Sequence, residues 1–166
     1  MTYKSSTNSG KKSLPKEDDS IFFSNISLIE AREHLDPLAA EERLLWAFEK
    51  FGETFVLTTS FGIQSAVLLH MIQACNSEIK PKVIWIDTGY LPPETYIYSE
   101  KLSELFNLNL EVIQSHFSPA RMEAIYGRLW ETNSPKDLEK YHLIRKVQPL
   151  EKAFEDLNVQ CWASGV

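Results

Sequence analysis

Residues 57–66, LTTSFGIQSA, gather hydroxyl side chains where an apolar strand gives way to an apolar helix. A helix that begins at the end of a strand presents free backbone N–H groups and the positive end of its dipole, which favours an anion. Gly62 would let the backbone approach a bulky oxyanion closely, and Ser60 and Ser65 would add hydroxyl donors. The segment therefore predicts an anion site, with simple capping of the helix by Thr59 and Ser60 as the alternative.

A second polar group ends the next apolar strand, KVIWIDT, residues 82–88. The Asp87 carboxylate could accept hydrogen bonds from a ribose hydroxyl or an adenine amine, as acids at strand ends do in nucleotide-binding folds. Thr88 and Gly89 follow directly. The alternative is a plain Asp-Thr-Gly turn before a helix that starts at Pro93.

Arg145 and Lys146 are adjacent cations at the start of another helical segment. Because adjacent residues on a helix cannot face the same way, we expect one to point to a pocket and the other to solvent. A solvated pair is the alternative. His70 is expected to be packed in the core. Cys75 and Cys161 are expected to be structural thiols, since nothing cationic flanks either to lower its pKa.

Composition narrows the class of protein. The 166 residues are 43% hydrophobic and 24% charged, with a net charge of −6, which is typical of a globular domain and argues against coating of nucleic acid. Apolar runs fall short of the ~20 residues of a transmembrane helix. Two cysteines in no metal-ligand spacing favour a reducing, cytoplasmic compartment. Residues 1–24 lack the apolar segment of a secretory signal and are expected to be a disordered tail, with one α/β domain over residues 25–166.

The apolar pattern predicts helices that alternate with strands after the tail. Strands are expected at 54–60, 82–88, 109–115 and 159–165, and helices at 27–35, 37–52, 63–75, 93–106, 118–130 and 144–157. The helix 63–75 is expected to turn Val67, Leu68, Met71 and Ile72 inward. Strands that are apolar on both faces indicate a parallel sheet covered on both sides, with a ligand at the carboxyl ends of the strands where the strand order switches.

Two familiar phosphate loops are excluded, because the chain contains neither G-x-x-x-x-G-K-[ST] nor G-x-G-x-x-G. The spacing S-F-G-I-Q-S instead matches S-G-G-x-D-S, the pyrophosphate loop of adenine nucleotide α-hydrolases. The chain resembles the 3′-phosphoadenylylsulfate (PAPS) reductase family of that superfamily, over about Leu35 to the last residue. The resemblance lies in five collinear segments: TTSFGIQSAVLLH, VIWIDTGYLPPETY, SPARMEAIYGRLWE, EKYHLIRKVQPLEKAF and QCWASG.

The resemblance implies a Rossmann-like α/β fold and a substrate site for PAPS. Gln64 stands where the adenylating members of the superfamily use a carboxylate to hold Mg²⁺, and a neutral amide is a poor ligand for that ion, so no metal is expected. The lysine after the arginine is the one that reaches the nucleotide in similar proteins. The expected substrate-binding residues are Thr59, Ser60, Phe61, Gly62, Gln64, Ser65, Asp87, Thr88, Gly89 and Lys146.

The resemblance also implies the cofactor and the reaction. Tyr141 and His142 stand where the branch that uses adenylylsulfate begins the cysteine signature of an iron–sulfur cluster, so a cluster-free enzyme is expected. In that branch a cysteine thiolate attacks the phosphosulfate sulfur and releases adenosine 3′,5′-bisphosphate. Reduced thioredoxin or glutaredoxin then frees sulfite, as a step of sulfate assimilation and cysteine biosynthesis. Such reductases are often homodimers.

The family nucleophile lies in an E-C-G-L-H motif, and an arginine-rich R-R-x-x-S loop follows the W-x-x-G segment. Neither motif occurs in this chain, and Cys161 matches neither. The chain is therefore expected to be the N-terminal two-thirds of a reductase, without catalytic residues of its own and inactive alone. The alternatives are a catalytically dead nucleotide-binding fragment, an adenylating enzyme such as an ATP sulfurylase small subunit, and a purely structural module.

Overall fold

The computed structural model describes residues 22–23, 26–75 and 80–165, which divide into two compact units, Met1–Asp36 and Pro37–Val166. In the first unit, β1 (Phe22–Phe23) pairs antiparallel with β2 (Ile26–Ser27), and α1 (Leu28–Leu35) follows. Ser27 caps α1, because its hydroxyl accepts the Glu30 N–H while the Glu30 carboxylate accepts the Ser27 N–H. The helix predicted at 27–35 is confirmed. The predicted tail, residues 1–24, lies outside the described residues apart from β1.

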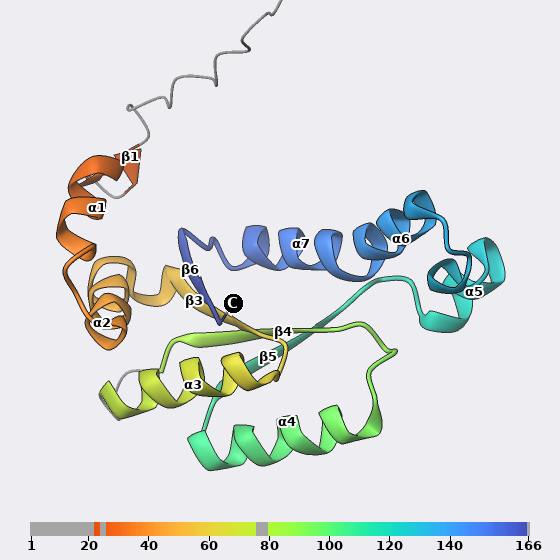
Figure 1. The fold of residues 1–166 in the computed structure, drawn as a ribbon, viewed down its shortest axis with the longest axis horizontal. Helices are drawn as coiled ribbons and strands as arrows, with labels where there is room; N and C mark the ends of the chain where they lie inside the picture. The colour runs from red at the N-terminus through yellow and green to blue at the C-terminus, as the bar shows by residue number, and fades with distance from the viewer. Residues whose placement is uncertain (1–21, 24–25, 76–79, 166) are drawn as a thin grey trace, which may run out of the picture. The chain divides into compact units, whose positions relative to one another are not determined.

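The second unit is built on a parallel sheet of four strands, β3 (Phe55–Thr59), β4 (Lys82–Asp87), β5 (Asn109–Gln114) and β6 (Cys161–Ser164). Their order across the sheet is β5-β4-β3-β6 (Figure 1). The predicted α/β fold with a parallel sheet is confirmed, and the four predicted strands lie within two residues of the observed bounds.

The connections place helices on both faces of this sheet. Two steps in one direction, β3 to β4 through α3 (Ile63–Cys75) and β4 to β5 through α4 (Pro93–Phe106), bring both helices to the same face when the crossovers are right-handed. The return step from β5 to β6 runs the other way, so its last helix, α7 (Gln148–Asp156), covers the opposite face (Figure 1). Before β3, the chain forms α2 (Ala40–Phe51) and the short turn η1 (Gly52–Thr54).

The central strands are buried on both faces, and the outer strands are not. Phe55, Val56 and Leu57 of β3 are at most 1% exposed. The residues of β5 and β6 are half-buried or exposed, and Val112 and Trp162 are 47% and 57% exposed. The prediction that the sheet is covered on both sides therefore holds for β3 and β4 but is wrong for the outer strands.

Two helical predictions are wrong in detail. Pro37 was expected in the first turn of its helix, but α2 begins at Ala40, because the Glu42 carboxylate reaches back 2.8 Å to the Ala39 N–H. In α3 the predicted inward side is correct for Ile72, which is buried, and for Leu68 and Met71, which pack partly buried against the core. It is wrong for Val67, which is 51% exposed, and it omitted the buried Ser65 and Leu69.

His70 was expected in the core and lies exposed on α3, with its ring 6.0 Å from that of Phe106.

The return connection from β5 contains more helix than the sequence predicted. After α5 (Pro119–Tyr126) and the short turn η2 (Leu129–Glu131), one continuous helix runs through α6 (Pro135–His142), the π-helical turn η3 (Leu143–Val147) and α7. The sequence predicted this helix from residue 144 only.

The buried centre of β3 makes a test of the fold. Leu57 is 0% exposed and belongs to the main core cluster, so Leu57→Ala should lower the free energy of unfolding by about 2–5 kcal/mol through lost burial and a cavity. The matched control is Leu105→Ala on α4, where the side chain is 67% exposed and the change should stay within about 0.5 kcal/mol. Urea unfolding measures both. Equal losses in the two variants would contradict the assignment of β3 to the core.

Candidate functional site

The strand order creates one place where a ligand is expected. From β3 the chain proceeds to β4 on one side, whereas β6 arrives on the other side with Thr58 paired to Ser164. At such a switch point the connections leave the sheet in opposite directions and open a crevice at the carboxyl ends of the strands. A hollow occupies this place, lined by Thr58, Thr59, Ser60, Ser65, Trp85, Ile86, Thr88, Leu91, Lys146, Val147, Leu150, Ser164 and Gly165.

The turn between β3 and α3 is held by its own hydroxyl groups. Thr59 Oγ1 accepts the Phe61 N–H at 3.0 Å, and Ser65 Oγ accepts the Ser60 N–H at 3.4 Å. The first bond of the helix runs from the Ala66 N–H to the Gly62 carbonyl. The N–H groups of residues 63–65 precede that bond, so they are free to donate to an anion at the start of α3.

Phe61, rather than Gly62, adopts the left-handed backbone conformation, with φ of 54°. It stands at the first glycine of S-G-G-x-D-S, where such a conformation is unstrained. Its ring is 5% exposed and packs edge-on against Trp85 with ring centres 5.0 Å apart. Burial of the ring therefore offsets the cost of a positive φ in a non-glycine residue. A Cβ on Gly62 would meet only Ser60 Oγ, at 3.5 Å.

The end of β6 closes the hollow from the other side. A Cβ on Gly165 would lie 2.8 Å from the Gln64 carbonyl oxygen and 3.1 Å from Ser65 Cα. The backbone after β6 therefore lies directly against the first turn of α3, with no room for a side chain. The Gln64 side chain itself is exposed and does not line the hollow.

Asp87 lies at the end of β4 and joins three other segments. Its Oδ1 accepts the Gly89 N–H at 2.8 Å and the Tyr96 hydroxyl at 2.7 Å, and its Oδ2 accepts the Gln114 side-chain amide at 2.6 Å. The residue is 6% exposed. These bonds match the alternative of an Asp-Thr-Gly turn, and a direct role in nucleotide binding stays a prediction.

The ionised form of Asp87 is favoured by its neighbours. Burial alone would raise the pKa of the carboxyl group, but the bonds from Gly89, Tyr96 and Gln114 and the charge of Arg145 outweigh it and lower the pKa. Burial, together with the contact with Asp87, raises the pKa of Tyr96, so the phenol stays protonated and donates. Asp87 and Gly89 line a neighbouring hollow, together with Gln114, Ser115, Pro119 and Arg145.

The side chains of Arg145 and Lys146 point in different directions, as helical geometry requires. They do not, however, divide into one side chain in a pocket and one in solvent. Arg145 is 1% exposed and donates to the backbone carbonyls of Thr88 and Phe117, so the expectation of a solvated partner is wrong. Lys146 lines the switch-point hollow. The two directions arise within η3, where wider π-helical spacing is often found at functional sites.

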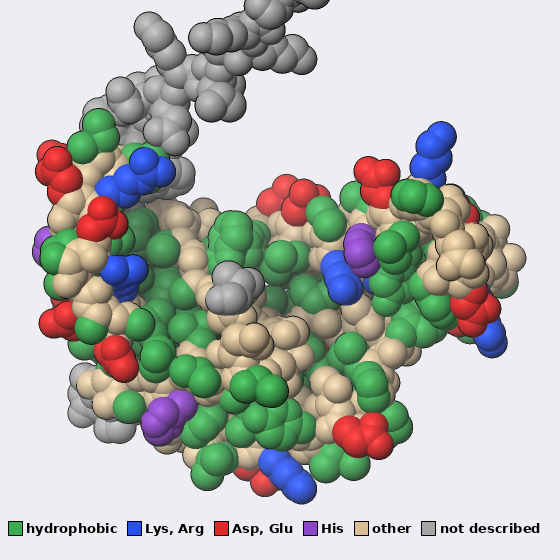
Figure 2. All heavy atoms as spheres, viewed as in Figure 1, with side chains coloured by type: hydrophobic (Ala, Val, Ile, Leu, Met, Phe, Trp, Pro, Cys, Tyr) green, Lys and Arg blue, Asp and Glu red, His purple; other side chains and the backbone are tan. Residues whose placement is uncertain are grey.

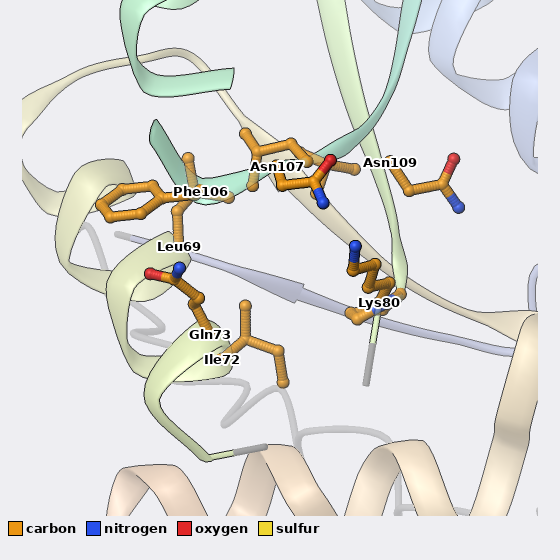
Figure 3. A pocket seen from close by; sticks show the side chains of 10 residues that line it. Leu69, Ile72, Gln73, Lys80, Phe106, Asn107 and Asn109 are labelled. Atoms are coloured by element: carbon orange, nitrogen blue, oxygen red, sulfur yellow. The ribbon is translucent and has the colours of Figure 1, made fainter. Parts of the chain in front are cut away.

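Another hollow lies at the opposite end of the sheet, between the ends of α3 and α4 and the starts of β4 and β5 (Figure 3). Leu69, Ile72 and Phe106 contribute apolar surface to it, and Gln73, Lys80, Asn107 and Asn109 contribute polar groups. Helices α3 and α4 end here, so their dipoles present partial negative charge. An anion is therefore better accommodated at the switch point than here.

The two thiols have unreactive surroundings. Burial raises the pKa of Cys161 in β6, and burial together with the charge of Glu41 raises that of Cys75, so the thiolate form is disfavoured in both.

Among the described residues, no cluster of three His, Cys, Asp or Glu side chains could hold a metal ion, and no helix is long and apolar enough to cross a membrane. On the face shown in Figure 2, Lys and Arg side chains are scattered rather than gathered into a patch.

Comparison with known proteins identifies the class. Residues 54–166 match the model of the phosphoadenosine phosphosulfate reductase domain. The chain is 51% identical over 140 residues to phosphoadenosine 5′-phosphosulfate reductase of a Synechococcus strain, covering 84% of this chain and 60% of that protein. It is 43% identical over 155 residues to the enzyme of that name from Zymomonas mobilis, covering 93% and 60%.

A solved structure agrees with the sequence relatives. The fold matches that of phosphoadenylyl-sulfate (PAPS) reductase from Candida auris, solved as a phosphate complex, with a TM-score of 0.70, 28% identity, and coverage of 85% of this chain and 68% of that one. The chain therefore belongs to the PAPS reductase family. It spans 60% of the length of the Synechococcus and Zymomonas relatives and 52% of a Synechocystis one.

The structure brings together part of the predicted substrate site. Thr59, Ser60, Ser65, Thr88 and Lys146 line one hollow, although they come from three separated segments. The other predicted residues, Phe61, Gly62, Gln64, Asp87 and Gly89, lie outside that lining. The apolar wall of the hollow includes Trp85, which the sequence left open as core or pocket wall. Sequence reasoning missed the rest of that wall, Ile86, Leu91, Val147 and Leu150, because apolar residues in strands and helices signal a core as readily as a pocket.

The lowered pKa of Asp87 predicts a pH dependence of stability. A carboxyl group with a lower pKa in the folded state stabilises the fold above its unfolded pKa, about 3.9, and that contribution is lost as the pH falls through the folded value. Asp87→Asn should lower the free energy of unfolding at pH 7 by about 1–3 kcal/mol and flatten its decline below about pH 4. Glu100→Gln, an exposed change on α4, is the control. Unfolding curves from pH 7 to pH 2.5 with equal slopes in wild type and Asp87→Asn would contradict this account.

Proposed function

We propose that this chain carries the nucleotide-binding part of a PAPS reductase, and that the switch-point hollow holds the phosphosulfate of PAPS. The observation that carries the proposal is the convergence of three anion-binding elements in a chain of this family. These are the N-terminal turn of α3, the hydroxyls of Thr59, Ser60 and Ser65, and the ammonium group of Lys146. The related Candida auris structure, a phosphate complex, supports the choice of ligand.

The remaining predicted residues would shape the site rather than bind directly. Phe61 and Gly62 set the path of the turn, and the Gly89 N–H fixes the Asp87 carboxylate. Asp87 Oδ2 accepts a hydrogen bond from the Gln114 side-chain amide and has capacity for one further donor, such as a ribose hydroxyl or an adenine amine. Gln64 supplies no carboxylate, which fits a ligand bound without a metal ion.

For the whole protein we propose the reaction of the cluster-free branch. A cysteine thiolate attacks the sulfur of the phosphosulfate, an S–S bond forms, and the S–O bond to phosphate breaks to release adenosine 3′,5′-bisphosphate. Reduced thioredoxin or glutaredoxin then attacks the enzyme thiosulfonate, releases sulfite and ends as a disulfide. Tyr141 and His142 stand in place of cluster cysteines, so we propose no iron–sulfur cofactor. A cytoplasmic location, a role in sulfate assimilation and a homodimeric state complete the proposal.

A catalytically inactive nucleotide-binding protein is the second candidate. The observation that favours it is the raised pKa of both thiols, Cys75 and Cys161, which leaves this chain without an activated nucleophile. The two candidates share the binding site and differ in turnover, so binding and turnover need separate experiments.

Binding is tested at Lys146. Lys146→Met should weaken adenosine 3′,5′-bisphosphate by about 10- to 100-fold, because a charge-assisted hydrogen bond contributes about 1.5–3 kcal/mol. The control is Lys152→Met, which removes an equal charge from α7, where the lysine pairs with Asp156 at 2.9 Å. Isothermal titration calorimetry of the 166-residue chain measures both dissociation constants. Equal effects of the two substitutions would show that general charge, rather than this site, governs binding.

Turnover is tested at Cys161. Because burial disfavours its thiolate, Cys161→Ser should change neither nucleotide affinity nor the rate of sulfite release from PAPS with reduced thioredoxin. Sulfite is measured with the unmodified chain, the Cys161→Ser variant and a full-length relative as positive control. Turnover that disappears in Cys161→Ser would make this thiol the nucleophile and overturn its assignment as a structural residue.

A further inference from the structure

Arg145 has the largest fully buried side chain of the described residues, at 1% exposure. A permanently charged group in such a place must have its N–H groups satisfied, because its removal from water is costly. Its partners are unusual. Nε and Nη2 both donate to the Thr88 carbonyl, the former at 2.7 Å, and Nη1 donates to the Phe117 carbonyl. The ion pairs found among the described residues do not include it.

The two carbonyls belong to different loops at the same edge of the sheet. Thr88 directly follows β4, and Phe117 lies between β5 and α5. One side chain from a third segment, η3, therefore ties the loops after two neighbouring strands to the helix that carries it. A planar guanidinium can bridge two fixed acceptors in this way, whereas the single nitrogen of a lysine cannot reproduce the fork.

The surroundings leave the guanidinium little freedom. Gly89 has φ of 73°, and a Cβ there would lie 2.7 Å from Pro119 Cγ and 3.1 Å from Arg145 Nη2. The Tyr90 ring centre lies 5.5 Å from the guanidinium carbon. The charge of Arg145 is also felt at Asp87, which holds the same loop through the Gly89 N–H. The loop after β4 is thus held at two neighbouring points. Arg145 binds the Thr88 carbonyl, and the Asp87 carboxylate accepts the Gly89 N–H.

The clamped groups adjoin the residues of the switch-point hollow. Thr88, whose carbonyl Arg145 holds, lines the hollow, and so does Lys146, the next residue along η3. Arg145 itself is absent from that lining and borders the neighbouring hollow with Asp87 and Ser118. Any displacement of the guanidinium would move η3 relative to the loop after β4, and with it the distance between Lys146 and Thr88.

We propose that Arg145 is a positioning residue: it clamps the loops after β4 and β5 to η3 and thereby holds Lys146 and Thr88 in register at the nucleotide site. The inference rests on the proposed function for the identity of the ligand. The clamp itself is a property of the protein without ligand, so the two can be tested apart.

The clamp is tested by hydrogen exchange of the 166-residue chain without nucleotide. Arg145→Lys keeps the charge and loses the fork, so the amides of Gly89, Tyr90 and Phe117 should exchange at least several-fold faster, while the amides of β3 stay unchanged. The control is Ile144→Val, which removes one methyl group from the neighbouring buried side chain and leaves the guanidinium in place. Unchanged exchange in both loops of Arg145→Lys, or equal acceleration in Ile144→Val, would overturn the clamp.

Positioning is tested by a double-mutant cycle with adenosine 3′,5′-bisphosphate, measured by calorimetry on wild type, Arg145→Lys, Lys146→Met and the double variant. Arg145→Lys alone should weaken binding about tenfold, and in the Lys146→Met background its further effect should be clearly smaller than tenfold, since one of the two groups that it positions is then already lost. Additive losses would overturn the positioning role and indicate an independent contact. Wild type that fails to bind the nucleotide would overturn the proposed function and the positioning role, whereas the exchange result would still decide the clamp.

Discussion

The placement of β3 between two parallel neighbours is the constraint on which the rest of this protein depends. A central strand forms backbone hydrogen bonds along both edges only when it has a neighbour on each side. Here β4 lies on one side of β3, and β6, which comes late in the chain, returns to lie on the other. That return requires the long helical connection across the opposite face of the sheet. It also brings the end of β6 against the first turn of α3 and sends η3 past the ends of the strands. The anion site is thus a consequence of strand order, because its hydroxyls, backbone N–H groups and lysine come from segments that only this order brings together.

A polar network beside the site gives the loops their shape. Asp87 binds Gly89, Tyr96 and Gln114, and Arg145 binds the carbonyls of Thr88 and Phe117, so the ends of β4 and β5 are linked by a buried charge of each sign. The two charges contact backbone and neutral groups, and the charge of Arg145 helps to lower the pKa of the Asp87 carboxyl group. Buried polar groups of this kind specify one arrangement when all are satisfied, and no buried side-chain nitrogen or oxygen among the described residues lacks a partner.

Much of this arrangement could be predicted from the sequence, and the reasons for the failures are physical. Continuous apolar runs such as FVLTT and KVIWID identify buried parallel strands, and the hydroxyl residues at their ends identify the anion turn. The inward side of α3 could be predicted only in part, with Ile72 correct and Val67 wrong, because a helix with apolar residues on several sides offers more than one stripe to the sheet. Burial of Arg145 could not be predicted either, since its partners are backbone carbonyls, which carry no signal in the sequence. The position of Asp87 at the end of a strand could be predicted. The donors of its three hydrogen bonds could not, because they lie 2, 9 and 27 residues away in the sequence.

The π-helical turn also sets a limit on variation in chain length. Each residue added to or deleted from an α-helix rotates everything beyond it by about 100°, as 3.6 residues per turn require. Within the continuous helix from Pro135 to Asp156, Arg145 and Lys146 must face two different targets while α7 keeps its apolar side on the sheet. A single-residue deletion between Tyr141 and Gln148 would convert the wide turn to regular α-helix. Either Arg145 and Lys146 before it or the apolar side of α7 after it would then face the wrong direction. Insertions and deletions should therefore be tolerated far less in this helix than in the surface connections, whatever the residues exchanged.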